Sequence, residues 1–190
     1  GPIRISRADL DQGPGWRPRL ECPSTLGPED TGTDKTMRLT LRTNLAMRTL
    51  MHCAVRAPDQ LRTADVARAC NASFHHVAAV VNKLESQGFL QTTRGRGGGI
   101  ALAMDPADIP VGLVFRLFES DTSFAECMDP ARNTCPLIGA CRLSGLLCDA
   151  LDAFYAALDR HSVADLIDGN AALARILAPA DAPSANKLPV

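Results

Sequence analysis

The sequence predicts a mainly α-helical protein with a small β-hairpin wing: a winged helix-turn-helix followed by a long apolar helix. Apolar residues recur at three- and four-residue steps through much of the chain after residue 38, which is the period of a helix that buries one face. A tight turn separates two short helical stretches, and a glycine-rich stretch separates two short strand patterns. Aromatic residues make up only 4% of the chain, so we expect a core mostly of Leu, Val and Ala.

The first 36 residues differ in composition from the rest of the chain. They are rich in Gly, Pro, Asp and Thr, above all at 13–15 and 23–35. Such a segment buries too little apolar surface to offset the entropy lost on ordering. We therefore expect residues 1–36 to be a disordered extension or a segment left from cloning, with Met37 as the start of the natural chain.

Two helices are predicted before the tight turn. The first covers about 39–56 and ends at Ala57-Pro58, because proline lacks the N–H that would continue the helix. The second is short, from 64 to 69, with Thr63 as its N-terminal cap. Both have apolar residues at helical spacing.

A third helix follows the turn at 71–73, with Ser73 as its cap and an end near Gln87. Two short helices joined by such a turn are typical of a helix-turn-helix, whose second helix enters the major groove of DNA with its N-terminal residues against base edges. The alternative is that these residues are merely solvated. The predicted DNA-contacting residues of this helix are Ser73, Phe74, His75 and His76.

A β-hairpin is predicted next, with strands at 89–93 and 99–103. Its tip, 94–98, consists of glycines and two arginines, Arg94 and Arg96. Glycine permits positive backbone angles and close approach, and arginine suits a narrow minor groove. We therefore predict that Arg94 and Arg96 bind DNA as a wing, against the alternative of a solvated hairpin tip.

The net charge of −1 excludes a uniformly basic surface, so DNA binding requires a local basic patch. Lys83 and Arg62 are candidate phosphate contacts, which contribute affinity but carry no sequence information.

The second half of the chain is predicted to begin with a helix at 109–118 and to continue with a long helix at about 143–160. The apolar stripe of the long helix is wider than one small domain needs, so we predict that it joins two copies of the chain. A short helix at 162–166 and a flexible tail follow. The predicted division is 1–36, extension; 37–105, winged helix-turn-helix DNA-binding domain; 106–170, cysteine loop and dimerisation region; 171–190, tail.

Three cysteines, Cys127, Cys135 and Cys141, lie within fifteen residues of a segment that Pro130 and Pro136 keep from forming a long helix. Soft thiolates select zinc or iron–sulfur clusters. A structural zinc site normally has four Cys or His ligands with a closely spaced cysteine pair, which this loop lacks. A redox disulfide uses only two of the thiols, and an iron–sulfur cluster tolerates wide spacings and a fourth ligand other than cysteine.

The total of seven cysteines is odd, and neither a leader nor a membrane-spanning run is apparent, so we expect reduced thiols and a cytoplasmic protein. Cys53 and Cys70 are predicted to be small buried hydrophobic residues. Cys148 is a less favoured ligand. No nucleophile–base pair, phosphate-binding loop or paired acids suggest catalysis, so we predict that the chain is not an enzyme.

The chain carries three segments in order: Met37-Arg-Leu-Thr, Arg94-Gly-Arg-Gly-Gly-Gly-Ile-Ala-Leu and the three-cysteine loop. With these segments it resembles the iron–sulfur winged-helix transcriptional repressors, the family of NsrR, IscR and RirA. The resemblance covers about 37–170. The cysteine loop is most similar to the nitric-oxide-sensing NsrR type.

The resemblance implies a homodimeric repressor of a palindromic DNA operator, with an iron–sulfur cluster, [4Fe–4S] ahead of [2Fe–2S], held by Cys127, Cys135 and Cys141. Nitric oxide would act on the cluster and release the operator. In NsrR-type proteins a carboxylate from the partner's first helix can be the fourth ligand, but the matching residue here is Asn44. Asparagine there is similar to the iron-sensing RirA type, so an iron-responsive regulator and a metal-free thiol redox regulator of the same fold remain alternatives.

Overall fold

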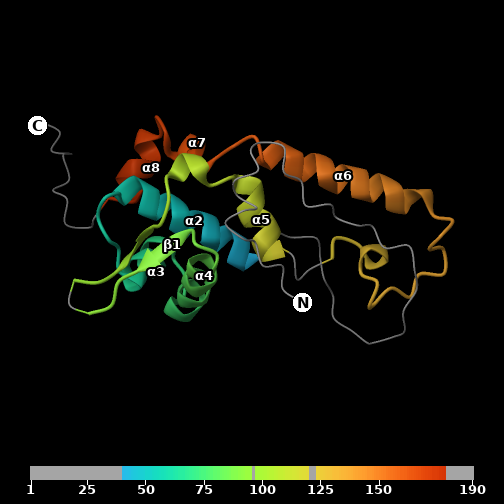
Figure 1. Cartoon of the computed structure of the whole chain (residues 1–190), viewed down its shortest axis with the longest axis horizontal. Helices are drawn as coiled ribbons and strands as arrows, with labels where there is room; N and C mark the ends of the chain where they lie inside the picture. Colours follow the sequence, from blue (N-terminus) through green and yellow to red (C-terminus); the bar gives the residue numbers. More distant parts are fainter. Residues whose placement is uncertain (1–39, 96, 120–122, 179–190) are drawn as a thin grey trace, which may run out of the picture. The chain divides into compact units, whose positions relative to one another are not determined.

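The computed structural model describes residues 40–95, 97–119 and 123–178 (Figure 1). The expectations for residues 1–36, Met37 and Arg96 and for the tail beyond residue 178 lie outside these ranges. The elements in order are α2 (Leu41–Arg56), α3 (Thr63–Ala69), α4 (Phe74–Ser86), β1 (Leu90–Thr92), β2 (Ile100–Leu102), η2 (Pro106–Asp108), α5 (Val111–Glu119), η3 (Glu126–Met128), α6 (Arg142–Leu158), α7 (Val163–Ile167) and α8 (Ala171–Ile176).

Two compact units make up the chain. Among the described residues, one combines 40–44 with 109–162, and the other combines 45–108 with 163–178. The mainly helical fold with a small antiparallel hairpin confirms the predicted fold class.

The helix-turn-helix consists of α2, α3 and α4, close to the predicted ranges. The apolar stripe of α4 is buried, as expected, at Val77, Val80, Val81 and Leu84. At the turn, Asn71 has a φ of 49°, a left-handed conformation that asparagine tolerates better than most residues. The prediction that Thr63 caps α3 was wrong: Thr63 is the first helical residue, and Arg62 occupies the cap position with extended backbone and no side-chain capping bond.

The hairpin pairs Leu90 with Leu102 and Thr92 with Ile100. The strands are shorter than predicted. Leu61 forms an isolated antiparallel bridge with Ile100, the first residue of β2. The Leu61 amide donates to the Ile100 carbonyl (2.9 Å), and the Leu61 carbonyl accepts from the Ile100 amide (2.7 Å). A Cβ on Gly99 would lie 2.6 Å from the Leu61 carbonyl oxygen, so this close approach requires glycine. The base of the wing is thus attached to the chain between α2 and α3.

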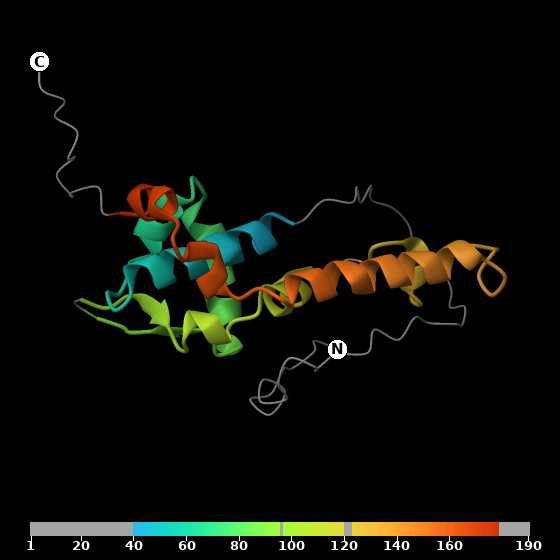
Figure 2. The ribbon, with the colours of Figure 1, turned by 90° about the horizontal axis from the view of Figure 1, so that it is seen from above.

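In the other unit, α5 lies beside the C-terminal end of α6 (Figure 2). The Arg116 guanidinium donates two hydrogen bonds to the Asp159 carboxylate, at 2.7 and 2.6 Å. Arg116 also lies 4.6 Å from the centroid of the Tyr155 ring. The helices approach closely at Gly112, where a Cβ would lie 2.1 Å from an Asp159 oxygen. A charged pair, an aromatic ring and a small residue therefore hold α5 to α6.

The predicted short helix near 162–166 is present as α7. The second short helix, α8, was not predicted. Asn170 caps α8 by accepting a hydrogen bond from the Leu173 amide at 3.0 Å, and Leu177, just after the helix, is buried. None of the helices in the described part of the chain is both long and apolar enough to cross a membrane.

Candidate DNA interface and cysteine loop

The N-terminal turn of α4 presents the four residues predicted to contact DNA. Ser73 caps the helix, its hydroxyl accepting a hydrogen bond from the His76 amide at 3.3 Å. Phe74, His75 and His76 are exposed on the side away from the buried stripe. Phe74 is 52% exposed, and the His75 ring meets it edge to face with centroids 6.0 Å apart. An exposed phenylalanine beside two imidazoles offers an apolar contact for a thymine methyl together with hydrogen-bonding groups.

The wing places Arg94 on an exposed tip, directly before Gly95, whose φ is +101°. A Cβ on Gly98 would lie 2.1 Å from the Thr93 carbonyl oxygen, so the tip closes only with glycine there. The Gln60 amide nitrogen donates to the Thr93 hydroxyl at 3.3 Å and fixes the base of the wing.

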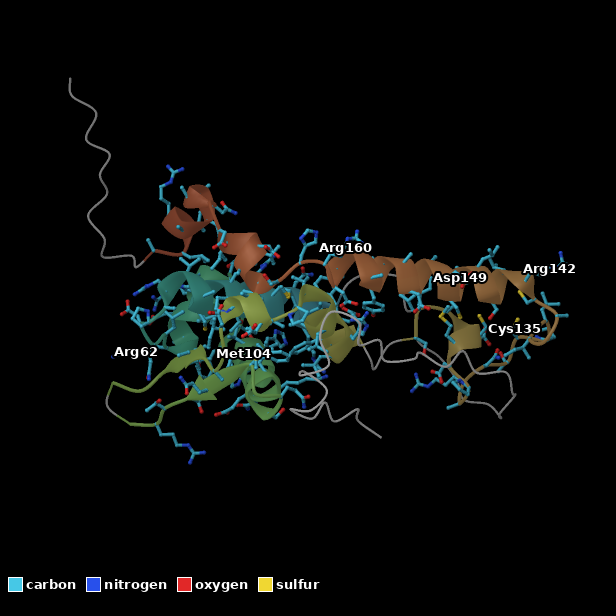
Figure 3. All side chains as sticks on the ribbon, turned by 45° about the horizontal axis from the view of Figure 1, so that its top comes forward. Arg62, Met104, Cys135, Arg142, Asp149 and Arg160 are labelled. Atoms are coloured by element: carbon cyan, nitrogen blue, oxygen red, sulfur yellow. The ribbon has the colours of Figure 1, made fainter. Side chains whose placement is uncertain are left out.

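The two candidate phosphate contacts differ in exposure. Arg62, exposed, lies between α3 and the wing strands (Figure 3), whereas Lys83 is half-buried on α4. The structure therefore brings three exposed predicted groups into one unit: the first turn of α4, the wing arginine and Arg62.

The cysteine loop runs beside the N-terminal half of α6 (Figures 1 and 2). Cys127, Cys135 and Cys141 are all free thiols and all half-buried. Cys127 lies in η3, Cys135 lies beside the stretch of α6 from Arg142 to Asp149 (Figure 3), and Cys141 is the N-cap residue of α6. The loop thus distributes three soft donors from η3 to the start of α6.

Two side chains that sequence reasoning missed hold this loop. The Glu126 carboxylate accepts from the Thr134 amide at 2.7 Å and from the Thr134 hydroxyl at 2.6 Å. These hydrogen bonds, the hydroxyl first, lower the pKa of Glu126. Because Glu126 precedes Cys127 and Thr134 precedes Cys135, the contact ties together the chain at the first two thiols.

Asn133 is the second such residue. Its side-chain oxygen accepts a hydrogen bond from the Cys135 amide at 2.9 Å, an arrangement by which asparagine stabilises a turn. Asn133 is only 1% exposed, and its Nδ2 has no hydrogen-bond partner. The sequence offered one indication, since asparagine two residues before a loop cysteine can form such a turn.

The donor set fits a soft metal or cluster because three free thiols lie within one short loop. The structure does not draw them into a coordination group: among the residues it describes, no three His, Cys, Asp or Glu side chains are placed to hold one metal ion. Cys148 is disulfide-bonded, so the expectation of reduced thiols is wrong for this cysteine, and Cys148 is not one of the free thiols. Asn44, at the position where the resemblance implies a fourth ligand, is exposed near the start of α2.

Two further cysteines, Cys53 and Cys70, and one histidine, His52, lie in the helix-turn-helix core. Cys53 and Cys70 are buried and free, as predicted, and burial, with nearby Cys70, raises the pKa of Cys53 to about 12. His52 is buried as well, with no partner for its Nδ1. Burial and then nearby Arg56 lower the pKa of His52, so its neutral form is favoured.

The apolar face predicted for the long helix is only partly covered by its own unit. Tyr155 is 8% exposed and packs against α5, whereas Leu143 and Leu146 are 59% and 65% exposed and Phe154 is 43% exposed. The Phe154 ring lies 6.2 Å from Phe115 on one side, and Leu147, Leu151 and Leu158 on the same helix are half-buried.

The family model and the related sequences that match this chain all describe transcriptional regulators. The profile of the family described as "Rrf2: Iron-dependent Transcriptional regulator" matches residues 39–169. The chain is 39% identical to a protein named HTH-type transcriptional regulator NsrR from Geobacillus kaustophilus over 142 residues, which cover 74% of this chain and 97% of that protein. It is 42% identical to the HTH-type transcriptional repressor NsrR of Streptomyces coelicolor over 133 residues, 69% of this chain and 88% of that protein.

Solved structures support the same fold. The global cysteine regulator CymR of B. subtilis superposes with a TM-score of 0.55 at 18% identity, covering 70% of this chain and 97% of CymR. T. potens IscR superposes with a TM-score of 0.53 at 19% identity, covering 69% of this chain and 86% of IscR. The relatives are regulators of transcription and not enzymes. The chain belongs to the Rrf2 family of transcriptional regulators.

Proposed function

We propose that this transcriptional repressor acts as a homodimer whose affinity for a palindromic operator is controlled by an iron–sulfur cluster, and that nitric oxide is its signal. The observation that carries the proposal is the loop with three free, half-buried thiols that leads directly into α6. The relatives named NsrR, two of them 39% and 42% identical to this chain, support the same assignment.

The DNA-binding half of the proposal rests on α4 and the wing. The exposed first turn of α4 offers Phe74, His75 and His76 to base edges, and exposed Arg94 suits the minor groove. In a dimer that binds two half-sites on one DNA face, the two α4 helices must lie about one helical turn apart, roughly 34 Å. Operator affinity therefore depends on how the two copies are held together.

The exposed face of α6 is the proposed dimer surface, with a second copy of the chain as its occupant. Leu143, Leu146 and Phe154 would contribute most of its apolar area. When two such faces pack together, they remove these side chains from water. Full burial of each contributes about 1.5–3 kcal/mol of favourable free energy.

Cys127, Cys135 and Cys141 are the proposed cluster ligands, because they are the three free thiols of the loop. When bound, the cluster supplies iron that reacts with nitric oxide. Cys141 connects this loop to the proposed dimer surface, because it is both a proposed ligand and the N-cap residue of α6. A change in the backbone at Cys141 therefore alters the first turn of α6, next to exposed Leu143 and Leu146.

An iron-responsive regulator is the second candidate, and Asn44 favours it. A neutral amide is a poorer iron ligand than a carboxylate, so a cluster with Asn44 near it would release iron more readily than one with an aspartate ligand. The family description, an iron-dependent regulator, agrees with this alternative.

Anaerobic reconstitution of the full chain, followed by absorbance spectroscopy, tests the proposal. We expect visible sulfur-to-iron absorbance that nitric oxide bleaches, together with release of an operator recovered by selection from random duplex DNA. Absorbance that ignores nitric oxide but fades with an iron chelator would replace nitric oxide by iron as the signal. Absence of the absorbance would leave a thiol switch.

Two single variants test the ligand assignment. Cys135→Ala should abolish the absorbance while leaving a folded dimer, measured by circular dichroism and light scattering. Cys70→Ala is the matched control, because Cys70 is also a free thiol but is buried in the helix-turn-helix. Full absorbance in Cys135→Ala would contradict the assignment.

A further inference from the structure

One polar atom of the cysteine loop is left without a partner. Asn133 is 1% exposed, and its Nδ2 is one of three buried side-chain polar atoms in the described residues that make no hydrogen bond. The other two, His52 Nδ1 and Gln87 Oε1, lie outside the loop. Buried polar groups in folded proteins are nearly always paired, so an orphaned donor in the loop that carries three free thiols calls for a specific acceptor.

The other end of the same side chain is fixed. Asn133 Oδ1 accepts from the Cys135 amide at 2.9 Å, which holds the carboxamide over the backbone of a proposed ligand. The neighbouring Thr134 is held in turn by Glu126 through two hydrogen bonds. The Asn133 carboxamide therefore cannot swing out to water without breaking the turn at Cys135.

The chemistry of the orphaned atom indicates what it pairs with. An amide nitrogen only donates, and the groups that concentrate in this loop are thiols, whose deprotonated sulfurs are acceptors. In iron–sulfur proteins, hydrogen bonds to the sulfurs stabilise negative charge on the centre and set its reduction potential. A donor kept dry by burial has a larger effect than one in water.

We propose that Asn133 Nδ2 donates a hydrogen bond to a sulfur of the iron–sulfur centre, either a cysteine thiolate or a bridging sulfide, and thereby raises the reduction potential of the centre. This inference rests on the proposed function, since it requires the cluster. It assigns Asn133 the role of a positioning and tuning residue that is not itself a ligand.

Two variants remove the donor in different ways. Asn133→Asp keeps an oxygen that can accept from the Cys135 amide but has no Nδ2 protons, and Asn133→Leu keeps the shape without either group. Thr134→Val is the matched control, because it perturbs the adjacent residue and the Glu126 contact but leaves the Asn133 carboxamide intact. All are reconstituted in the full chain without oxygen.

The measurements are the reduction potential of the centre and its iron–sulfur stretching frequencies by resonance Raman in H2O and D2O. We expect both Asn133 variants to have a lower potential than the wild type and to lose the solvent-isotope shift of an iron–sulfur mode. The Thr134→Val control should keep both. Unchanged potentials and isotope shifts in both Asn133 variants would overturn the inference.

If the variants do not retain a cluster, the wild type alone decides. Pulsed EPR of the reduced wild type, with asparagine labelled with ¹⁵N, should show a nitrogen coupled to the centre, and this coupling should persist in Asn44→Ala. Absence of the coupling overturns the inference while the proposed function stands. A wild type that never acquires iron–sulfur absorbance would refute both.

Discussion

Removing the charge of Asp159 is expected to destabilise the unit that carries the cysteine loop. The carboxylate receives two hydrogen bonds from Arg116 at 2.7 and 2.6 Å, and the two side chains are only 31% and 17% exposed. Fully exposed ion pairs contribute about 0.2–1 kcal/mol, whereas hydrogen bonds to charged groups contribute about 1.5–3 kcal/mol. Because this pair is bidentate and mostly covered, we expect Asp159→Asn to lower the free energy of unfolding by about 2 kcal/mol.

The assay is a double-mutant cycle on the cluster-free protein. Arg116→Met keeps the aliphatic stem near Tyr155 and removes the charge, and the coupling energy with Asp159→Asn isolates the pair. A loss of about 2 kcal/mol corresponds to roughly 4–8 °C in Tm for a chain of this size. Urea titration of each variant checks that the slope, and therefore the surface exposed on unfolding, is unchanged.

The control is an ion pair of the same charge type without the cover. Arg68 and Asp65 lie 3.1 Å apart on α3, but their side chains are 73% and 45% exposed. Asp65→Asn should therefore change the free energy of unfolding by less than about 0.5 kcal/mol. A coupling energy for the Arg116 pair as small as this control would refute the reasoning that burial and bidentate geometry make it strong.

Three further outcomes are expected. Arg94→Ala should weaken operator binding and reduce the slope of log affinity against log salt by about 1, measured by fluorescence anisotropy; an unchanged slope would remove the wing from the interface. Burial lowers the pKa of His52 below 6.5. The contribution of His52 to folding stability is therefore fully present above pH 6.5 and is lost as the pH falls through the pKa of the folded state. His52→Gln should flatten that part of the stability–pH curve in chemical denaturation. Leu146→Glu places a charge on the exposed α6 face and should convert dimer to monomer in sedimentation equilibrium, and a dimer of wild-type strength would exclude this face.

The helices were predictable because each has an apolar stripe at helical spacing that the structure buries, as α4 does with Val77 and Leu84. The cap of α3 was not predictable from residue type. Thr63 belongs to a type that often caps helices, but the extended backbone at Arg62 sets the actual start of the helix. Leu61 explains that backbone: its pairing with Ile100 draws residues 61–62 into extended conformation directly before the helix. Long-range strand pairing overrode a local preference there.

The missed helix α8 illustrates the same limit. Six residues are too few to show a helical period, and an isolated helix of that length is unstable in water. Asn170 supplies the cap, and the backbone carbonyl of Leu177, which is buried after the last turn, accepts a hydrogen bond from the His52 imidazole on α2. The helix therefore depends on a contact between residues more than a hundred positions apart, which periodicity cannot reveal.

Only part of the candidate site could be predicted from the sequence. The three loop cysteines are visible in the sequence because their residue type and spacing alone indicate soft-donor chemistry. The residues that shape the loop are not visible, since Glu126 reaches Thr134 only after the chain has turned through η3. The orphaned Nδ2 of Asn133 is a property of burial, which no short-range pattern encodes.

The start of α6 lacks the features that usually stabilise the first turn of a helix. Cys141 occupies the N-cap without a side-chain capping bond, the first turn has no acidic residue, and Arg142 places a positive charge at the positive end of the helix. By contrast, Ser73 and Asn170 cap α4 and α8 with their own side chains. The first turn of α6 is therefore weakly specified by its own sequence. Because exposed Leu143 and Leu146 belong to that turn and the next, a ligand bound at Cys141 would, under the proposed function, act on the part of α6 that carries the proposed dimer surface.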